Sequence, residues 1–437
     1  MGHRRLGGGV TVEQAHVVIV GGGFAGLGCA HELAKHPHHA RVTLIDRHDY
    51  HQFLPLLYQV ATFELAGDDV GVDLSELFRK RDSVEFARGD VTTADPETRS
   101  VTKDDGRTIE GDYLVLAGGS RANFFGTPGT EHVFPMYSLD DARRLRARIL
   151  SLFEGAERDP TEVDRGALTF VVVGAGATGT EVAGALADLI HEVMPSRFPG
   201  LAPARAHVVI VDAGTAVLGP FSPKAHDYAS KVLTDRGVEI RLGTSVKEVT
   251  ADRVTLSDGD TIATRCVIWG GGIEAAPLAH AVGLKQGRGG RIDVHEDLTV
   301  EDHPRVFVVG DLANIPGPAG RAFPQLGSVA LQAGHSAAEN ILHDVNGEPM
   351  QPFRYHDKGI MAMIGHNAAV AEMGEHRHEL HGAVGYAAWL GVHAYLMSGT
   401  RQRADAFINW AWDEFGKSRV LNTSDEARLH WEGDTDA

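Results

Sequence analysis

Two glycine triplets, each placed after a run of apolar residues, are the residues of this chain most suited to chemistry. The first triplet is Gly21, Gly23 and Gly26, and the second is Gly174, Gly176 and Gly179. Both fit the pattern GxGxxG, in which the first glycine permits a tight turn and the second lets a pyrophosphate approach the backbone. The third glycine lets helix and strand pack closely, so that the helix N-terminus faces the phosphates. The spacing therefore predicts two dinucleotide sites.

An acidic residue ends the apolar run that follows each triplet. Asp46 lies 20 residues beyond Gly26, where a carboxylate can accept hydrogen bonds from both ribose hydroxyls. Asp212 has the matching place in the second site, after a longer intervening segment. A carboxylate there repels a 2′-phosphate and no arginine follows it in VDAGTAVLG, so the second site favours NADH over NADPH. The alternative for Asp212 is a solvated strand end.

A third acid follows the apolar run VFVVG. Asp311 comes directly after Gly310, and a carboxylate at that place can bond a ribityl hydroxyl, which favours a flavin. The alternative is that Asp311 caps the helix that follows. A chain that holds one dinucleotide tightly and exchanges the other would be an electron-transfer enzyme.

Parallel strands must position these residues. Short apolar runs that end in glycine alternate with helical segments, which is the pattern of parallel α/β sheets. The predicted strands are Ala15–Val20, Arg41–Asp46, Tyr113–Ser120, Ala206–Gly214, Arg265–Gly272 and Arg305–Asp311. Glycines at the carboxyl ends of strands mark the edge where such sheets bind ligands. We therefore expect an α/β fold with two Rossmann-like dinucleotide-binding domains, the second inserted in the first.

Composition restricts the function classes. The chain of 437 residues has a net charge of −18, which argues against a nucleic-acid surface. Its two cysteines, Cys29 and Cys266, form no CxxC pair, so we expect buried small residues in a reduced compartment. The histidines of HPHHA, at 36–40, indicate a surface loop, and no metal site is expected. The N-terminal MGHRRLGGGVTVEQA has no apolar signal segment, and we expect a flexible lead-in.

The C-terminal part differs in character, because Gly382–Thr400 contains no charged residue. The 15 residues of Ala383–Met397 would span about 22 Å as a helix, short of the roughly 30 Å hydrocarbon core. Aromatic and basic residues nearby suit a membrane interface: Tyr386, Trp389, Tyr395, Arg401, Arg403, Phe407, Trp410, Trp412 and Phe415. We predict two amphipathic helices on the membrane surface. The alternative is a helical pair that forms a dimer or caps the core.

Several stretches in this order carry a resemblance to a known family: GGGFAGL, HQFLPLLYQVAT, YLVLAGGS, GAGATGTEVAGALADL, VIWGGG, VFVVGD, DKGIMAMIGHNAAV and HAYLMSGTRQRADAFINWAWDEF. Together they resemble the type II NADH dehydrogenases, which are single-subunit NADH:quinone oxidoreductases. The resemblance covers about Ala15–Phe415, and its narrowest motifs are FLPLLYQVAT and NWAW.

The resemblance implies FAD in the first site and NADH in the second. The residues implied for FAD are Gly21, Gly23, Gly26, Asp46, Val91, Ala117, Gly118, Gly310 and Asp311, and those for NADH are Gly174, Gly176, Gly179, Glu181, Asp212 and Gly272. It also implies an FAD-binding domain over 1–125 and 295–370, an NAD(H)-binding domain over 126–294, and a membrane-surface or dimerisation segment over 371–437.

The implied reaction moves a hydride from nicotinamide C4 to flavin N5 and then two electrons to a quinone, without proton pumping. Hydride transfer needs alignment more than an acid or base, since the cofactor carries the chemistry. Glu181, Gln332 and Lys358 match family positions near the flavin and the quinone. Glu181 could instead interact with the helix dipole, and Lys358 could be a solvated strand-end lysine.

One departure concerns the acceptor. The helix that lines the quinone site in the family usually carries two glutamines, and here Ser328 replaces the first while Gln332 matches the second. The expected partners are NADH, menaquinone or ubiquinone, the membrane surface, and a second copy of the chain if the tail dimerises. The expected location is the cytoplasmic side of the cell membrane, as a peripheral protein of the respiratory chain. The alternatives are a soluble NADH-dependent flavin reductase with another acceptor and a non-catalytic redox-sensing flavoprotein.

Overall fold

The computed structural model describes residues 14–201, 205–374 and 376–415, so most of the predicted lead-in lies outside the described residues. The chain divides into two compact units. Unit 1 comprises Met1–His51, Asp73–Arg121 and Glu274–His356, and unit 2 comprises Gln52–Val72, Ala122–Ile273 and Asp357–Ala437. These limits differ from the predicted domains, because 274–294 join unit 1, whereas 52–72, 122–125 and 357–370 join unit 2.

Unit 1 is built on a sheet of mostly parallel strands. Its order is β21 (Thr299–Val300), β22 (His303–Val308), β9 (Tyr113–Leu116), β1 (Ala15–Val20), β2 (Ala40–Asp46) and β5 (Val84–Arg88), with β21 alone antiparallel to its neighbour. The central strands are continuous apolar runs, and Val17, Ile19 and Leu114 are fully buried. Such runs are typical of parallel strands that are covered on both faces.

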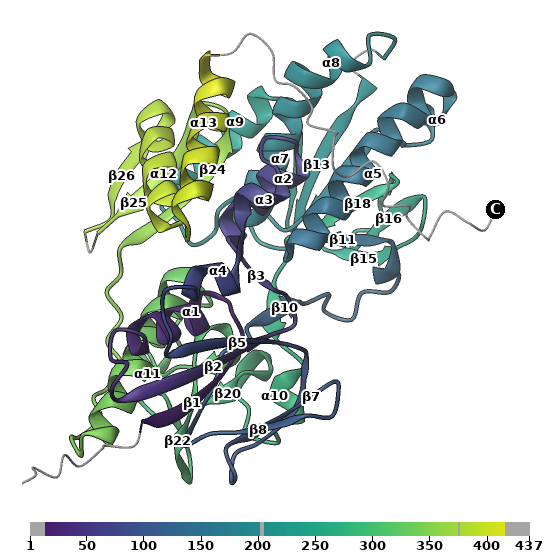
Figure 1. The fold of residues 1–437 in the computed structure, drawn as a ribbon. Coiled ribbons are helices and arrows are strands. Elements are labelled where there is room, and N and C mark those ends of the chain that lie inside the picture. The colour runs from purple at the N-terminus through teal and green to yellow at the C-terminus, as the bar shows by residue number, and fades with distance from the viewer. Residues whose placement is uncertain (1–13, 202–204, 375, 416–437) are drawn as a thin grey trace, which may run out of the picture. The chain divides into compact units, whose positions relative to one another are not determined.

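Two helices of unit 1 pack against each other, α1 (Phe24–Leu33) and α11 (Gly327–Val345) (Figure 1). Small residues permit their close approach, because a Cβ atom on Gly334 would lie 2.0 Å from the Ala25 carbonyl oxygen. The unit also contains α4 (Leu74–Phe78), α10 (Leu278–Ala281), the antiparallel strands β6 (Val91–Asp95), β7 (Ser100–Lys103) and β8 (Thr108–Glu110), and the pair β20 (Ile292–Asp293) and β23 (Ala313–Asn314).

Unit 2 contains the second parallel sheet. Its order is β11 (Val133–Pro135), β18 (Cys266–Trp269), β12 (Thr169–Val173), β13 (His207–Asp212) and β14 (Val238–Leu242). Its helices before the C-terminal part are α2 (Leu57–Ala61), α3 (Gly67–Val70), α5 (Leu139–Arg158), α6 (Thr161–Asp164), α7 (Ala177–Asp188), α8 (Met194–Arg197) and α9 (Pro223–Asp235). A separate antiparallel sheet holds β15 (Val246–Val249), β16 (Arg253–Leu256) and β17 (Thr261–Ala263). The predicted strands are thus present in the two sheets, and β9, β13, β18 and β22 end before the glycines that were included in their predicted ranges.

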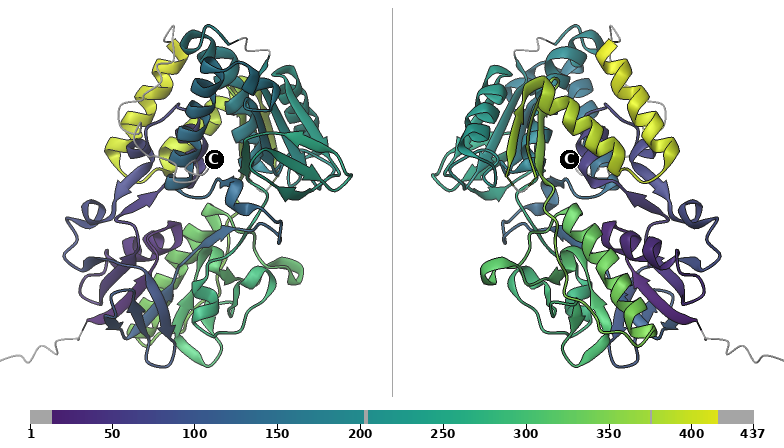
Figure 2. Two further views of the ribbon diagram at one scale, coloured as in Figure 1. Left: turned by 90° about the vertical axis from the view of Figure 1, so that its right-hand side faces the viewer. Right: turned by 90° about the vertical axis from the view of Figure 1, so that its left-hand side faces the viewer.

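The C-terminal part of unit 2 forms an antiparallel sheet followed by two helices. The strands are β24 (Gly359–Gly365), β25 (Ala368–Met373) and β26 (His378–His381), and the helices are α12 (Gly382–Leu396) and α13 (Thr400–Phe415). The strand β24 packs on α7, α12 packs on β25, and α12 and α13 lie side by side (Figure 2). Because of these contacts, residues 371–415 belong to the same compact unit as the second glycine triplet.

The predicted helical pair is present, but the expected position of two tryptophans is wrong. Trp389 is 0% exposed and Trp410 is 5% exposed, so neither anchors at a membrane interface. Their burial follows from the packing of α12 and α13 within unit 2. The side chains of Trp412 and Phe415 lie outside the described residues. Among the helices that the structure describes, none has the length and apolar character needed to cross a membrane.

Candidate functional site

The first glycine triplet forms a turn between β1 and α1. Gly21 has a φ of +107°, and a Cβ atom there would lie 2.3 Å from the Ala117 carbonyl oxygen. A Cβ atom on Gly26 would lie 1.8 Å from the Gly21 carbonyl oxygen, whereas one on Gly23 would meet no described atom within 4 Å. Neighbouring carbonyl oxygens therefore exclude a side chain at the first and third glycines. The second glycine faces open space at the start of a helix. This geometry fits a pyrophosphate.

Asp46 is fixed at the end of β2 by the same turn. Its Oδ2 atom accepts the Gly22 N–H at 2.6 Å, and its Oδ1 atom accepts the His48 N–H at 2.8 Å. Each carboxylate oxygen can accept a further hydrogen bond. The carboxylate therefore has the place and the acceptor capacity for the ribose hydroxyls of a dinucleotide.

The ends of β9 and β22 complete this edge of the unit 1 sheet. Gly310 has a φ of +69° and a Cβ atom there would lie 2.9 Å from the Ala25 Cβ atom, so the segment after β22 lies against α1. The Ser120 hydroxyl donates to Asp311 Oδ2 at 2.8 Å. Burial raises the pKa of Asp311, although the Ser120 hydrogen bond and the charge of Arg291 oppose that effect.

The alternative role of Asp311 as a helix cap is not observed, because Asp311 lies inside the short 3₁₀ turn Gly310–Leu312, whose N-terminal cap is Val309. Gly118 follows Ala117 directly at the end of β9, and a Cβ atom on it would approach Leu278. Val91 begins β6 and packs against the hydrophobic core of unit 1, which contains the buried strands of its sheet.

The second triplet repeats the geometry of the first. Gly174 has a φ of +101°, and its added Cβ atom would lie 2.6 Å from the Gly270 carbonyl oxygen. The Cβ atom of an alanine at Gly179 would lie 1.8 Å from the Gly174 carbonyl oxygen, and one at Gly176 would meet no described atom within 4 Å. This turn, between β12 and α7, also fits a pyrophosphate.

Asp212 corresponds to Asp46 in its contacts as well as its place. Its Oδ2 atom accepts the Ala175 N–H at 2.7 Å, and its Oδ1 atom accepts the Gly214 N–H at 2.5 Å. Since β12 lies between β18 and β13, the turn has Asp212 on one side and Gly270–Gly272 on the other. A dinucleotide at such a turn extends to both sides of it.

Glu181 lies in α7, shortly after the second glycine turn, and is buried. Its Oε1 atom accepts the Met363 N–H at 3.2 Å. Burial raises the pKa of Glu181 to about 8, although the Met363 N–H and the Trp389 indole favour the charged form. The Trp389 indole nitrogen is buried and forms no hydrogen bond of regular geometry with any residue that the structure describes. A pKa of about 8 leaves the carboxyl group mostly protonated at neutral pH, so that it can donate a proton. Glu181 lies beyond the first turn of α7, which contains no acidic residue.

A polar cluster in unit 2 lies near this carboxyl group, and the sequence did not reveal it. Trp410 Nε1 donates to Gln59 Oε1 at 3.0 Å, and Gln59 Nε2 donates to the Tyr58 hydroxyl at 3.3 Å. Burial raises the pKa of Tyr58 well above its usual range, and the neighbouring Glu181 adds to that effect. Tyr58 and Gln59 belong to the motif FLPLLYQVAT, which was the available signal.

The other predicted catalytic residues have different surroundings. The Gln332 amide accepts the His356 N–H at 3.0 Å and donates to the His356 carbonyl at 3.1 Å, so both of its ends bind backbone. The Ser328 hydroxyl lies 2.9 Å from the Tyr355 hydroxyl. In unit 2, Lys358 is exposed just before β24. Gln332 and Ser328 thus fasten a segment of chain to α11.

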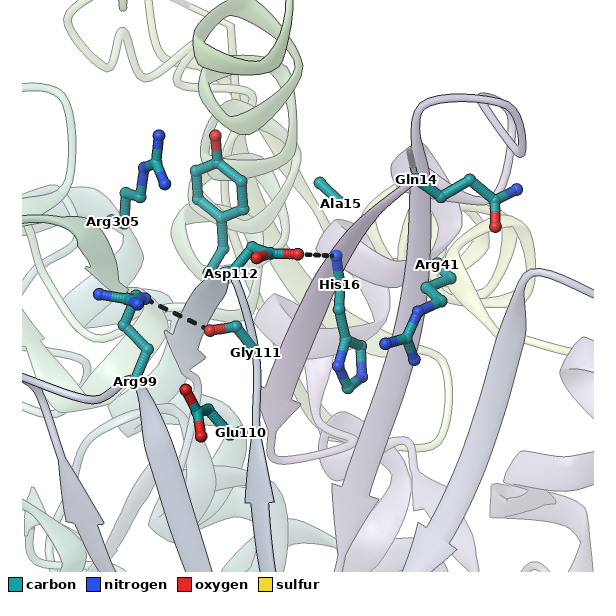
Figure 3. Close-up of a pocket in the computed structure, with 10 residues that line it drawn as sticks. Gln14, Ala15, His16, Arg41, Arg99, Glu110, Gly111, Asp112 and Arg305 are labelled. Atoms are coloured by element: carbon teal, nitrogen blue, oxygen red, sulfur yellow. Dashed lines mark hydrogen bonds between the residues drawn. The ribbon is translucent and has the colours of Figure 1, made fainter. Parts of the chain in front are cut away.

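A polar cavity of about 760 Å³ lies at the opposite edge of the unit 1 sheet, near the amino ends of β1 and β9 (Figure 3). Its charged lining residues are Arg41, Arg99, Glu110, Asp112 and Arg305. The Asp112 carboxylate accepts the His16 N–H at 2.7 Å, and Arg99 donates to the Gly111 carbonyl at 3.3 Å. Because dinucleotides bind at the carboxyl edge of such sheets, this cavity is separate from the glycine turns.

Comparisons with known proteins agree with this geometry. The family described as pyridine nucleotide-disulphide oxidoreductase matches residues 15–334. The type II NADH:quinone oxidoreductase NdhA of Mycobacterium tuberculosis is 36% identical over 421 residues, which cover 92% of this chain and 88% of that protein. The Staphylococcus aureus type II NADH:quinone oxidoreductase is 30% identical over 373 residues, 82% of this chain and 89% of that protein. The chain belongs to the type II NADH:quinone oxidoreductases.

Solved structures show the same fold as this type II oxidoreductase. The structure of NDH2 from Plasmodium falciparum in complex with NADH has a TM-score of 0.85 at 17% identity, covering 94% of this chain and all of that one. The sulfide:quinone oxidoreductase of Aquifex aeolicus has a TM-score of 0.72 at 18% identity, with coverages of 92% and 96%. Family membership confirms the resemblance, the fold class and the prediction of an oxidoreductase.

Proposed function

We propose that this chain is an FAD-dependent enzyme that oxidises NADH and reduces a quinone. The observation that carries the proposal is the pair of glycine turns with matching geometry, one in each compact unit, in a member of this family. One turn serves a resident flavin and the other an exchanging nicotinamide nucleotide. FAD, when bound, accepts a hydride and passes on two electrons.

The first turn holds FAD in this proposal. The open side of Gly23 receives the pyrophosphate, since a side chain there would occupy its space. Asp46 accepts hydrogen bonds from the adenosine ribose, and Asp311 accepts one from the ribityl chain. Gly21, Gly26, Ala117, Gly118 and Gly310 provide the close backbone around it, and Val91 contributes apolar surface near the adenine.

The second turn holds NADH. Gly176 leaves space for the pyrophosphate, and Asp212 accepts hydrogen bonds from the adenosine ribose. The two backbone donors on Asp212 orient its carboxylate, which would repel the 2′-phosphate of NADPH. Gly272, three residues beyond the end of β18, has a φ of +143° and lies on the side of the turn away from Asp212. The nicotinamide half extends toward that side.

Glu181 is the proton donor of the proposed reaction. A quinone takes up two protons with its two electrons, and a buried carboxyl group with a pKa near neutrality can supply one of them. The Tyr58 hydroxyl belongs to the same cluster, and the nearby Glu181 helps to keep it protonated by raising its pKa. Gln332 acts by holding His356 in place, and Lys358 supplies an exposed positive charge at the start of β24.

The C-terminal helices support the proposal of a peripheral membrane position, which we place on the cytoplasmic side. Large apolar side chains that are 40 to 75% exposed gather on α12 and α13: Val384, Tyr395, Leu396, Phe407 and Ile408. Among the exposed large apolar residues of the described chain, Phe125 is the one that lies elsewhere. A lipid surface suits this set because a quinone dissolves in lipid. A second copy of the chain is the other partner that would cover it.

A soluble flavin reductase with another acceptor is the second candidate function. The observation that favours it is the hydrogen bonding of Ser328 and Gln332, since both side chains bind protein groups of unit 1. Disulfide chemistry is disfavoured, because Cys29 and Cys266 are both buried and belong to different units. Burial also raises the pKa of the Cys266 thiol to about 12.

The test is a spectrum followed by an acceptor assay. The purified protein should be yellow, NADH should bleach its flavin band, and menaquinone or ubiquinone analogues should restore that band. Gly176→Asp, which places a carboxylate in the proposed pyrophosphate space, is the matched variant and should stay yellow without bleaching. A colourless protein that does not take up FAD would refute the proposal. Fast bleaching that only oxygen or a soluble acceptor reverses would support the second candidate.

A further inference from the structure

A tight turn in unit 2 holds a phenylalanine in a conformation that such residues rarely adopt. The Thr127 N–H donates to the Phe124 carbonyl at 2.9 Å, which closes the turn. The two central residues have positive φ angles, +52° at Phe125 and +74° at Gly126. Two successive positive angles are those of a type I′ turn, whose first central residue is usually Asn, Asp or Gly. A bulky side chain at that place is an outlier.

Among the large apolar residues with a positive φ angle in the described chain, Phe125 is the most exposed. Leu218 and Leu298 also have positive φ angles, and both are fully buried. The ring of Phe63, another such residue, lies under the guanidinium of Arg146 at 4.6 Å. The Phe125 side chain is 69% exposed. Residues held in sparsely populated backbone regions are concentrated at ligand sites, where the conformation has a function.

The exposed ring lies at the strand end that borders the second glycine turn. A Cβ atom on Gly272 would come within 3.0 Å of the Phe125 Cζ atom. The turn is fastened there because the Asn123 N–H donates to the Gly272 carbonyl at 3.0 Å. Gly270, two residues earlier, is the residue against which Gly174 packs. Phe125 and the proposed NADH turn therefore adjoin the same three-glycine segment.

The strand order decides which half of the dinucleotide the ring would meet. Asp212, at the end of β13, marks the adenosine side of the turn, and β18 lies on the other side of β12. The ring of Phe125 is thus on the nicotinamide side. We propose that Phe125 packs its ring against the nicotinamide half of the bound nucleotide and orients it. This inference rests on the proposed binding of NADH at the second turn. Aromatic rings stack well on a planar heterocycle of this kind.

The experiment separates the ring from the turn that carries it. NAD⁺ and ADP-ribose are titrated calorimetrically into the FAD-loaded protein, since neither reduces the flavin and ADP-ribose lacks the nicotinamide. We expect Phe125→Asn to weaken NAD⁺ binding about tenfold and to leave ADP-ribose binding unchanged. Its melting temperature should rise, because asparagine suits the first central place of the turn. Phe125→Tyr keeps a ring and should bind NAD⁺ like the wild type.

A matched control tests whether relief of backbone strain alone changes affinity. Asp302 has a φ of +63°, is exposed and lies in unit 1. Asp302→Gly should therefore raise the melting temperature without a change in NAD⁺ affinity. Equal NAD⁺ affinities for wild type and Phe125→Asn would overturn the inference, and so would an equal loss of NAD⁺ and ADP-ribose binding. A wild-type protein that binds neither nucleotide would refute the proposed function itself.

Discussion

Replacement of Glu181 by glutamine tests the protonation of the buried carboxyl group. The pKa of Glu181 rises from an ordinary value of 4.5 to about 8 in the folded protein, chiefly because burial disfavours the charged form. The unfolded chain therefore releases this proton at a lower pH than the folded chain. As a result, the free energy of unfolding of the wild type declines as pH rises from about 4.5 to about 8. Glutamine does not titrate, so Glu181→Gln lacks this decline.

The size of the effect follows from the shift. Each pH unit inside this window changes the stability difference between variant and wild type by roughly 1.4 kcal/mol, and the whole window by roughly 5 kcal/mol. The variant keeps an amide oxygen for the Met363 N–H, so its backbone contact is preserved. Stability relative to the wild type should thus increase steadily with pH and become constant above the folded-state pKa.

The assay is urea unfolding at a series of pH values, followed by tryptophan fluorescence. Trp269, Trp389 and Trp410 all belong to unit 2, which also contains Glu181, so the signal reports unfolding of the relevant unit. Infrared spectroscopy gives a second measurement, because the wild type at neutral pH should show a protonated-carboxyl band that the variant lacks. Parallel stability profiles for the two proteins, with no such band, would refute the reasoning.

Three further changes have defined outcomes. Gly179→Ala should weaken NADH binding more than tenfold in titration calorimetry, because its Cβ atom would lie 1.8 Å from the Gly174 carbonyl oxygen; unchanged affinity would contradict this. Trp410→Phe removes the hydrogen bond to Gln59 and should cost about 1–2 kcal/mol in urea unfolding, whereas a neutral result would mean that water replaces the indole. Phe407→Asp should reduce co-sedimentation with anionic liposomes without slowing flavin reduction, and undiminished co-sedimentation would exclude α13 from the membrane contact.

The features that sequence could predict depend on short stretches of chain. The strand before Gly21, the open place at Gly23 and the acid at Asp46 follow from local steric and hydrogen-bonding demands of one βαβ unit. These demands leave a pattern of residue types at fixed spacing. The second glycine turn could be predicted for the same reason, even though the segment before Asp212 is longer than usual.

The features that sequence did not predict depend on residues far apart in the chain. Glu181 and Met363 are 182 residues apart, and Gln59 and Trp410 are 351 residues apart. No local pattern encodes such pairs, because they form only when the elements of unit 2 assemble. The expected place of Trp389 was wrong for a related reason: α12 is apolar on most of its surface, so its sequence does not indicate which face is buried.

The equivalence of the two glycine turns has a consequence for how the protein tells its nucleotides apart. Both turns leave room at the middle glycine, and both hold an aspartate through two peptide donors. The two turns can make the same contacts with the ADP part that FAD and NADH share. They therefore contribute almost nothing to the choice between a flavin and a pyridine nucleotide. The choice must therefore depend on the residues of each unit that contact the flavin or the nicotinamide part of the ligand. Those residues can change during evolution while the residues around the ADP part stay alike.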